Sequence, residues 1–186
     1  PPAEVVTSCG PYTWATNGQT YSATGIYTSN GITQGYNNLA NWQNNVNLFN
    51  SNVATNSLGG LPNTNPINLT VGATSVSLGA TNGMYTTSVF VGTNTATDAL
   101  TITLGPGVYG FGANIYATDI NDAVTTGDLT VTYSTGFSET RTVTAASEFF
   151  GYTSTTPITS VTITCANTVA PFKWPTINNL SLATNP

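Results

Sequence analysis

Several acidic and amide side chains of this chain gather in one short stretch, where they could bind a metal ion. They are Asp119, Asn121, Asp122 and Asp128. Carboxylate and amide oxygens at alternate positions are the ligands that Ca²⁺ prefers, although the Gly and terminal Glu positions of an EF-hand do not match. The same side chains also suit a solvated turn, in which they bond to the backbone. A structural calcium ion and an ordinary turn are therefore both open, and no other cofactor is expected.

Residues for acid–base or nucleophilic catalysis are scarce. The chain contains no histidine, which removes the usual general base and excludes Ser-His-Asp and Cys-His pairs. A glycosidase needs two carboxyl groups about 5 Å or roughly 6.5–9.5 Å apart across the scissile bond. With only seven acidic residues in the chain, Glu139 and Glu148 among them, such a pair is not expected. We predict a protein that is not an enzyme.

Aromatic residues are the best candidates for ligand recognition. The chain has three Trp and nine Tyr residues. A flat ring can stack on a sugar while Asn and Gln amides bond to its hydroxyl groups. We take Trp14 and Trp174 as candidate glycan-binding residues. Packing in the core or anchoring of a loop is the alternative for each of them, and also for Trp42.

The only two cysteines are Cys9 and Cys165, which lie near opposite ends of the chain. In a chain of exported-type composition, this pair predicts one disulfide between the N-terminal segment and a late strand. Closing so long a loop would stabilise the folded state by about 5 kcal/mol on the chain-entropy model. The alternative is two buried, unpaired thiols.

Charge is the unusual feature of the composition. Only 5% of the 186 residues are charged, with two basic and seven acidic residues, against roughly a quarter in ordinary soluble proteins. Binding to a phosphate backbone needs clustered Lys and Arg, so we expect no nucleic-acid partner. No apolar run approaches the ~20 residues of a membrane span, so no membrane insertion is expected. A polar, nearly uncharged surface suits neutral glycans, mineral or ice surfaces, or further copies of the chain.

Hydrophobic and polar residues alternate from residue 67 to residue 147, with Gly, Pro and Asn turns between the runs. This period of two predicts antiparallel strands with one buried face. The runs are Ile67-Leu69-Val71, Val76-Leu78, Val89-Val91, Leu100-Ile102-Leu104, Val108 to Ile115 and Leu129-Val131-Tyr133, followed by residues 158–164 and 177–182. We predict an all-β, two-sheet antiparallel sandwich of about eight or nine strands, jelly-roll-like, forming a single domain over residues 1–186.

Two further elements are expected before the sandwich. Tyr12-Thr13-Trp14 and Gln19-Thr20-Tyr21 flank the turn signal Asn17-Gly18, which predicts a β-hairpin in an N-terminal extension over residues 1–28. Residues 39–49 have mixed apolar spacing and predict a short helix, although Asn favours turns.

Threonine alternates along several of the predicted strands. The pairs are Thr101/Thr103, Thr130/Thr132, Thr140/Thr142 (followed by Thr144) and Thr162/Thr164. Flat threonine ladders can order water, as ice-binding surfaces do. Threonine is also a favoured residue for the solvent-facing side of any strand, so the pattern alone does not choose between the two.

Short pieces between residues 99 and 183 occur in a characteristic order. They are Ala99 to Leu104, Gly110 to Asn114, Thr118 to Asn121, Phe149 to Tyr152, Pro157 to Ile163 and Trp174 to Leu180. Together they resemble a domain of exported bacterial proteins, often those with PEP-CTERM sorting signals. Its relatives typically read Asp-Asn-Leu where this chain has Asn178-Asn179-Leu180. Separately, Tyr12-Thr13-Trp14 to Gly25-Ile26-Tyr27 is similar to aromatic repeats of bacterial surface adhesins.

The resemblance implies a jelly-roll-like extracellular domain with a matrix-associated or glycan-related function. Low charge removes the repulsion that keeps proteins monomeric, and sheet edges invite strand addition. We therefore expect a secreted, cell-surface structural subunit of an extracellular fibre or matrix that associates with itself, residues 3–7 being a candidate added strand. The alternative is a carbohydrate-binding or adhesive module with a neutral glycan as its partner.

Overall fold

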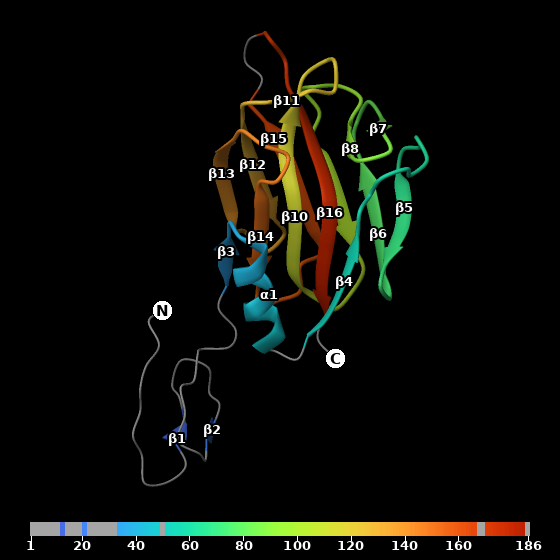
Figure 1. Ribbon diagram of the computed structural model, residues 1–186. Coiled ribbons are helices and arrows are strands. Elements are labelled where there is room, and N and C mark those ends of the chain that lie inside the picture. Colours follow the sequence, from blue (N-terminus) through green and yellow to red (C-terminus); the bar gives the residue numbers. More distant parts are fainter. Residues whose placement is uncertain (1–11, 14–19, 22–32, 49–50, 167–169, 185–186) are drawn as a thin grey trace.

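The computed structural model describes residues 12–13, 20–21, 33–48, 51–166 and 170–184. Two antiparallel sheets, one of eight strands and one of six, pack face to face (Figure 1), which confirms the predicted all-β sandwich. Apart from these, β1 (Tyr12–Thr13) pairs antiparallel with β2 (Thr20–Tyr21), as expected for the N-terminal hairpin.

The eight-stranded sheet has the order β3-β14-β10-β16-β8-β7, with β11 beside β10 and β4 beside β16. The long strands β10 and β16 form its centre (Figure 1). Its strands are β3 (Gln34–Tyr36), β4 (Asn52–Asn56), β7 (Met84–Thr86), β8 (Val91–Thr93), β10 (Val108–Thr118), β11 (Val124–Thr125), β14 (Phe149–Thr153) and β16 (Trp174–Thr184).

The six-stranded sheet has the order β13-β12-β15-β9-β6-β5. From β8 onward the chain passes repeatedly from one sheet to the other, a connection pattern that is typical of jelly rolls. The strands of this sheet are β5 (Ile67–Val71), β6 (Thr74–Gly79), β9 (Leu100–Leu104), β12 (Gly127–Tyr133), β13 (Ser138–Val143) and β15 (Ser160–Cys165).

The sandwich contains more strands than the eight or nine that the sequence predicts. Three of the additional strands, β3, β7 and β11, are only two or three residues long and too short for a period of two to register. The other two, β4 and β14, have five residues each, but their burial does not alternate between apolar and polar positions. One predicted inward pair is also wrong, because Val91 is buried while Val89 is 59% exposed in the turn before β8.

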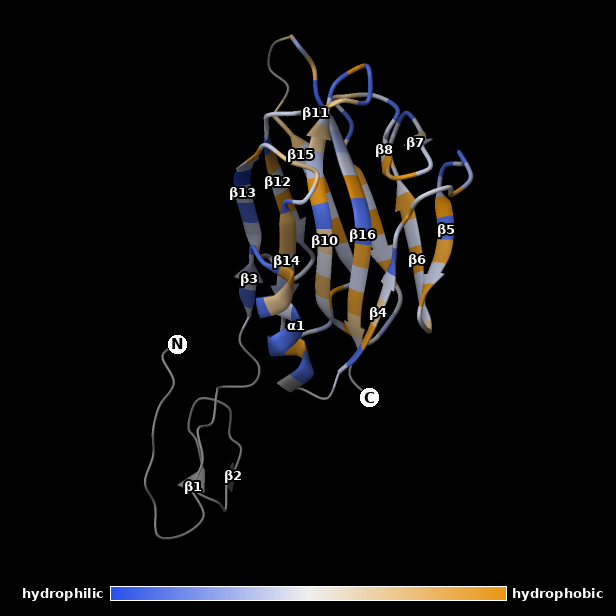
Figure 2. Cartoon of the chain, in the orientation of Figure 1, coloured by the Kyte–Doolittle hydropathy of each residue, from blue (hydrophilic) through white to orange (hydrophobic). Residues whose placement is uncertain are grey.

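The core lies between the two sheets and is built from the inward-facing residues of each strand. In β12 the buried positions alternate strictly, with Leu129 and Val131 fully enclosed. Hydrophobic bands alternate with polar ones along the strands in Figure 2. Burying each such side chain stabilises the fold by roughly 1.5–3 kcal/mol, so the alternation by itself selects which face of each strand turns inward.

The predicted helix is present as α1 (Leu39–Leu48). Asn38 caps it, since its Oδ1 accepts a hydrogen bond from Asn41 N at 3.2 Å. The helix lies on the outer face of the eight-stranded sheet, where Trp42 is fully buried. A Cβ atom at Gly112 or Gly151 would come within 3.4 Å and 2.9 Å of the Trp42 ring. Glycines in β10 and β14 therefore provide the space that this indole occupies.

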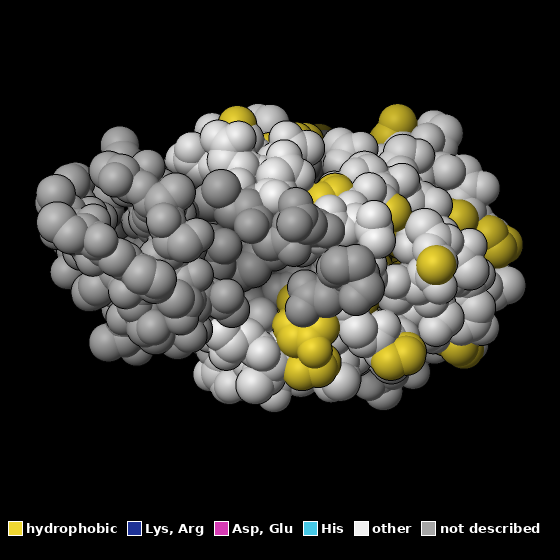
Figure 3. Space-filling model, turned by 90° about the horizontal axis from the view of Figure 1, so that it is seen from below, with side chains coloured by type: hydrophobic (Ala, Val, Ile, Leu, Met, Phe, Trp, Pro, Cys, Tyr) yellow, Lys and Arg dark blue, Asp and Glu magenta, His cyan; other side chains and the backbone are white. Residues whose placement is uncertain are grey.

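Charged side chains are rare in this chain, with two basic and seven acidic residues. Seen from below, the described surface shows scattered hydrophobic side chains and no charged ones (Figure 3).

Candidate functional site

A pocket of about 190 Å³ opens on the outer face of the eight-stranded sheet. In β16 and β8, Ile177 and Val91 are paired and belong to the core, so the next pair, Thr176 and Gly92, faces the opposite side. The pocket is smaller than the ~300–1,000 Å³ of sites for drug-sized ligands. It therefore suits a small ligand or a single unit of a longer one.

The floor of the pocket is polar. Thr118 and Thr176 form a buried hydroxyl–hydroxyl hydrogen bond of 3.0 Å. Gly92 completes the floor, and a Cβ atom there would lie 3.3 Å from both Pro175 O and Thr176 Oγ1. A larger residue at this position would crowd the backbone of β16, so glycine keeps the floor open.

Aromatic side chains form the walls. Tyr85, from the edge strand β7, and Phe90 stand on one side, with ring centroids 6.3 Å apart. Trp174, the first residue of β16, also lines the pocket, is only partly buried and donates its indole N–H toward Asn94 O at 3.5 Å. The tryptophan that the sequence proposed for ligand binding thus lies at a concave, accessible site.

The loop after β10 contributes two carboxylates, Asp119 and Asp122. Asp119 Oδ1 accepts hydrogen bonds from the N–H groups of Asn121 and Ala123 at 2.8 and 3.0 Å. These bonds make the turn of Asx type that the sequence allowed as the alternative to a metal site. They hold Asp122 in a left-handed conformation with φ of 65°.

Asp122 is connected to the opposite wall. Its Oδ2 accepts a hydrogen bond of 2.8 Å from the Tyr85 hydroxyl. This hydrogen bond and the negative charge of Asp122 raise the pKa of Tyr85 above its ordinary value. The contact joins β7 to the loop after β10 across the pocket.

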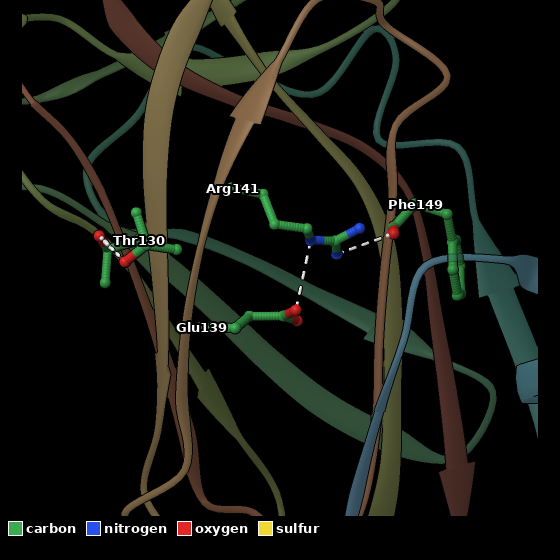
Figure 4. A network of polar contacts seen from close by, with 5 residues as sticks. Thr130, Glu139, Arg141 and Phe149 are labelled. Atoms are coloured by element: carbon green, nitrogen blue, oxygen red, sulfur yellow. Dashed lines mark hydrogen bonds and ion pairs between the residues drawn. The ribbon is translucent and has the colours of Figure 1, made fainter.

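Neither of the chain's two basic residues lines this pocket. Lys173 lies beside Gly127, since a Cβ there would be 3.2 Å from Lys173 Cδ. Arg141 lies on β13 in the other sheet, 3.2 Å from Glu139 and 2.9 Å from Phe149 O (Figure 4). Its guanidinium also lies 3.5 Å from the centre of the Phe150 ring. The two aspartates therefore give the pocket a negative potential.

The four residues of the calcium hypothesis do not come together. Asp119, Asn121 and Asp122 share the loop after β10, whereas Asp128 is on β12 of the other sheet and accepts a hydrogen bond from Thr142 Oγ1 at 2.6 Å. Among the described residues, no three Asp, Glu, Cys or His side chains gather in a way that could hold a metal ion. Calcium binding by the loop stays a prediction, now without Asp128 as a ligand.

Of the two cysteines in the predicted disulfide, the structure describes only Cys165. Cys165, at the end of β15, is partly buried, and burial raises the pKa of its thiol. Cys9 lies outside the described residues, as does Trp14, so both predictions stand as made. For Trp42 the structure decides between the two alternatives. Its side chain is fully buried between α1 and the sheet, which excludes it from ligand recognition.

Sequence reasoning missed Tyr85, Phe90 and Asn94. They belong to the β7–β8 hairpin and the turn after it, where the strands are only three residues long and Val89-Val91 was the only alternation to indicate a strand. The only local signal was the pair of aromatic residues, Tyr85 and Phe90, on either side of Thr87-Ser88. Their meeting with Trp174 depends on the pairing of β8 with β16.

Comparisons with protein-family models, curated proteins and solved structures give no match for this chain. Within the described part of the chain, no helix has the length and apolar character needed to cross a membrane.

Proposed function

We propose that this protein is a secreted, non-catalytic carbohydrate-binding module whose pocket holds one sugar unit. The observation that carries the proposal is the grouping of Trp174 and Tyr85 with Asp119 and Asp122 over a hydroxyl floor. Rings with a few placed polar groups are the usual means of sugar recognition. The pocket thus favours the adhesive alternative over the fibre subunit.

Each group has a distinct part in this binding. The Trp174 ring offers an apolar face for the C–H groups of a sugar ring. Asp119 Oδ2 and Asp122 Oδ1 take no hydrogen bond from any described residue, so both can accept bonds from sugar hydroxyls. Thr118 and Thr176 are already bonded to each other and keep the floor in place.

The charge of the pocket narrows the class of sugar. Two carboxylates and the absence of a lining base disfavour uronic and sialic acids by like-charge repulsion. Neutral hexoses and amino sugars face no such repulsion. We therefore assign the ligand to the neutral or amino sugars.

Titration calorimetry against a neutral hexose, an N-acetylhexosamine, an amino sugar and a uronic acid tests the proposal. Trp174→Ala should weaken binding at least tenfold, which corresponds to about 1.4 kcal/mol. Phe172→Ala is the matched control, because Phe172 is an aromatic neighbour, 46% exposed, that does not line the pocket. A broad glycan array without signal, or equal losses in both variants, would refute the proposal.

Assembly into a fibre by strand addition is the second candidate. The edge strand β5 carries no charged residue and is the outermost strand of its sheet, a form of edge that can accept a further strand. The other edge, β13, has Glu139 and Arg141 turned inward, a device that protects edges from pairing. Sedimentation at high concentration and electron micrographs would detect filaments, and Thr70→Pro in β5 should abolish them.

A further inference from the structure

The outer face of the six-stranded sheet is an array of threonine and serine hydroxyl groups. The four Thr-x-Thr pairs of the sequence lie on β9, β15, β12 and β13, which are neighbours in the sheet order β13-β12-β15-β9. In each pair the residue between the two threonines turns inward, as Ile102, Val131 and Ile163 show by their complete burial. All four pairs therefore face the same side.

The strand registers align these threonines into rows across the sheet. Thr101 is paired with Thr162, Thr162 with Thr132, and Thr132 with Ser138. A second row runs from Thr164 through Thr130 to Thr140. Strand geometry sets the repeat of this array, at about 4.7–4.9 Å between strands and roughly 6.6 Å between alternate residues along a strand.

The hydroxyl groups of neighbouring strands also hold one another in place. Thr130 Oγ1 lies 2.8 Å from Thr140 Oγ1, and Thr132 Oγ1 lies 2.9 Å from Ser138 Oγ. A hydroxyl has one donor and two acceptor sites, so each bonded pair keeps one hydrogen and several lone pairs for the solvent side. The array is thus ordered before it meets a partner, which lowers the cost of binding.

The outward residues of these four strands are almost free of charge. The only acidic or basic side chain among them is Asp128, near the start of β12, which accepts a hydrogen bond from Thr142. None of these outward residues is aromatic. A polysaccharide surface is usually met by aromatic rings, and a second protein copy by an apolar interface centre. Neither kind of centre exists on this face.

We propose that this hydroxyl array binds ice. An uncharged lattice that offers hydrogen-bonding oxygens in two dimensions suits such an array, and ice is a lattice of this kind. The neutral face matches a lattice without net charge. This activity is separate from sugar binding, because the pocket lies on the outer face of the other sheet.

The test measures the gap between melting and freezing of a single ice crystal, and the partition of the protein into slowly grown ice. Wild-type protein should shape the crystal, open a gap that grows with concentration and enter the ice. Thr132→Lys places a long charged side chain inside the array and should reduce the gap at least tenfold. Thr164→Lys, in the second row, should do the same.

The matched control is Thr81→Lys, since Thr81 is exposed in the turn after β6 and lies outside the array. It should retain the full gap, and equal melting temperatures of all variants should show that each is folded. Exclusion of the wild-type protein from ice, or an equal loss in Thr81→Lys, would overturn the inference. Adsorption to crystalline cellulose that is lost in Thr132→Lys, without any effect on ice, would also overturn it.

Discussion

The Tyr85 hydroxyl donates a 2.8 Å hydrogen bond to Asp122 Oδ2 across the mouth of the pocket. Tyr85 belongs to an edge strand and Asp122 to the loop that follows a central strand. Their contact directly joins two elements that the sheet connects only through β8 and β16. It therefore maintains the width of the pocket over Thr118 and Thr176.

Removing Asp122 should change how Tyr85 titrates. Asp122 raises the pKa of the Tyr85 phenol, first through the hydrogen bond and then through its charge. The stability from this contact is complete below the ordinary tyrosine pKa of 10.0 and is lost as the pH rises through the higher folded value. A titration followed by phenolate absorbance should show one tyrosine that ionises at lower pH in Asp122→Ala than in the wild type. Tyr85→Phe should abolish that difference, and superimposed curves would contradict the contact.

Adding one methyl group under α1 should destabilise the fold. A Cβ at Gly151 would lie 2.6 Å from Phe149 Cε1 and 2.9 Å from Trp42 Cδ1. Gly151→Ala should therefore lower the free energy of unfolding by about 1–3 kcal/mol, measured by urea denaturation. In Gly79→Ala the nearest atom is at 3.4 Å, so this control should be nearly unchanged. Equal stability of both variants would mean that the Trp42 site tolerates more volume than the packing suggests.

Removing Arg141 should have a pH-dependent cost. Burial raises the pKa of Glu139, and Arg141 counteracts this rise. In Arg141→Met the pKa of Glu139 should rise further. Glu139 is then harder to ionise in the folded state than in the unfolded state. The resulting loss of folding stability is absent below the ordinary Glu pKa of 4.5 and grows as the pH rises above it.

Urea midpoints of wild type and Arg141→Met at pH 4 and pH 8 measure this effect. We expect an additional loss of about 1–3 kcal/mol at the higher pH. The double variant Glu139→Gln/Arg141→Met should lose most of the pH dependence. The same difference at both pH values would show that Arg141 acts only through its contacts with Phe149 O and the Phe150 ring.

The predicted Cys9–Cys165 disulfide has a direct chemical test. Alkylation in denaturant without reductant should leave the intact mass unchanged if the bond exists. Adding reductant first should then allow two alkyl groups to attach. If Cys165 is a thiol instead, its raised pKa should make native alkylation slow near pH 7 and faster as the pH rises.

The sequence by itself determined the properties that depend on residue type or on local spacing. The lack of histidine and the low charge need no structure to be known. The period of two identified the buried faces of strands such as β12, because each strand must turn its apolar side inward whatever its neighbours are. The same reasoning showed that Thr130 and Thr132 face the solvent.

Only the tertiary structure decided which of these faces meet. Sheet order and register come from pairing between strands distant in the chain, and local periodicity does not encode them. Trp174 looked like a loop residue until the pairing of β16 with β8 placed it beside Tyr85 and Asp122. The sequence left open whether Trp42 packs in the core, and glycines in β10 and β14 provide the room that buries it. The threonine pairs became one array for the same reason, because ladder hydrogen bonds between four strands set their alignment.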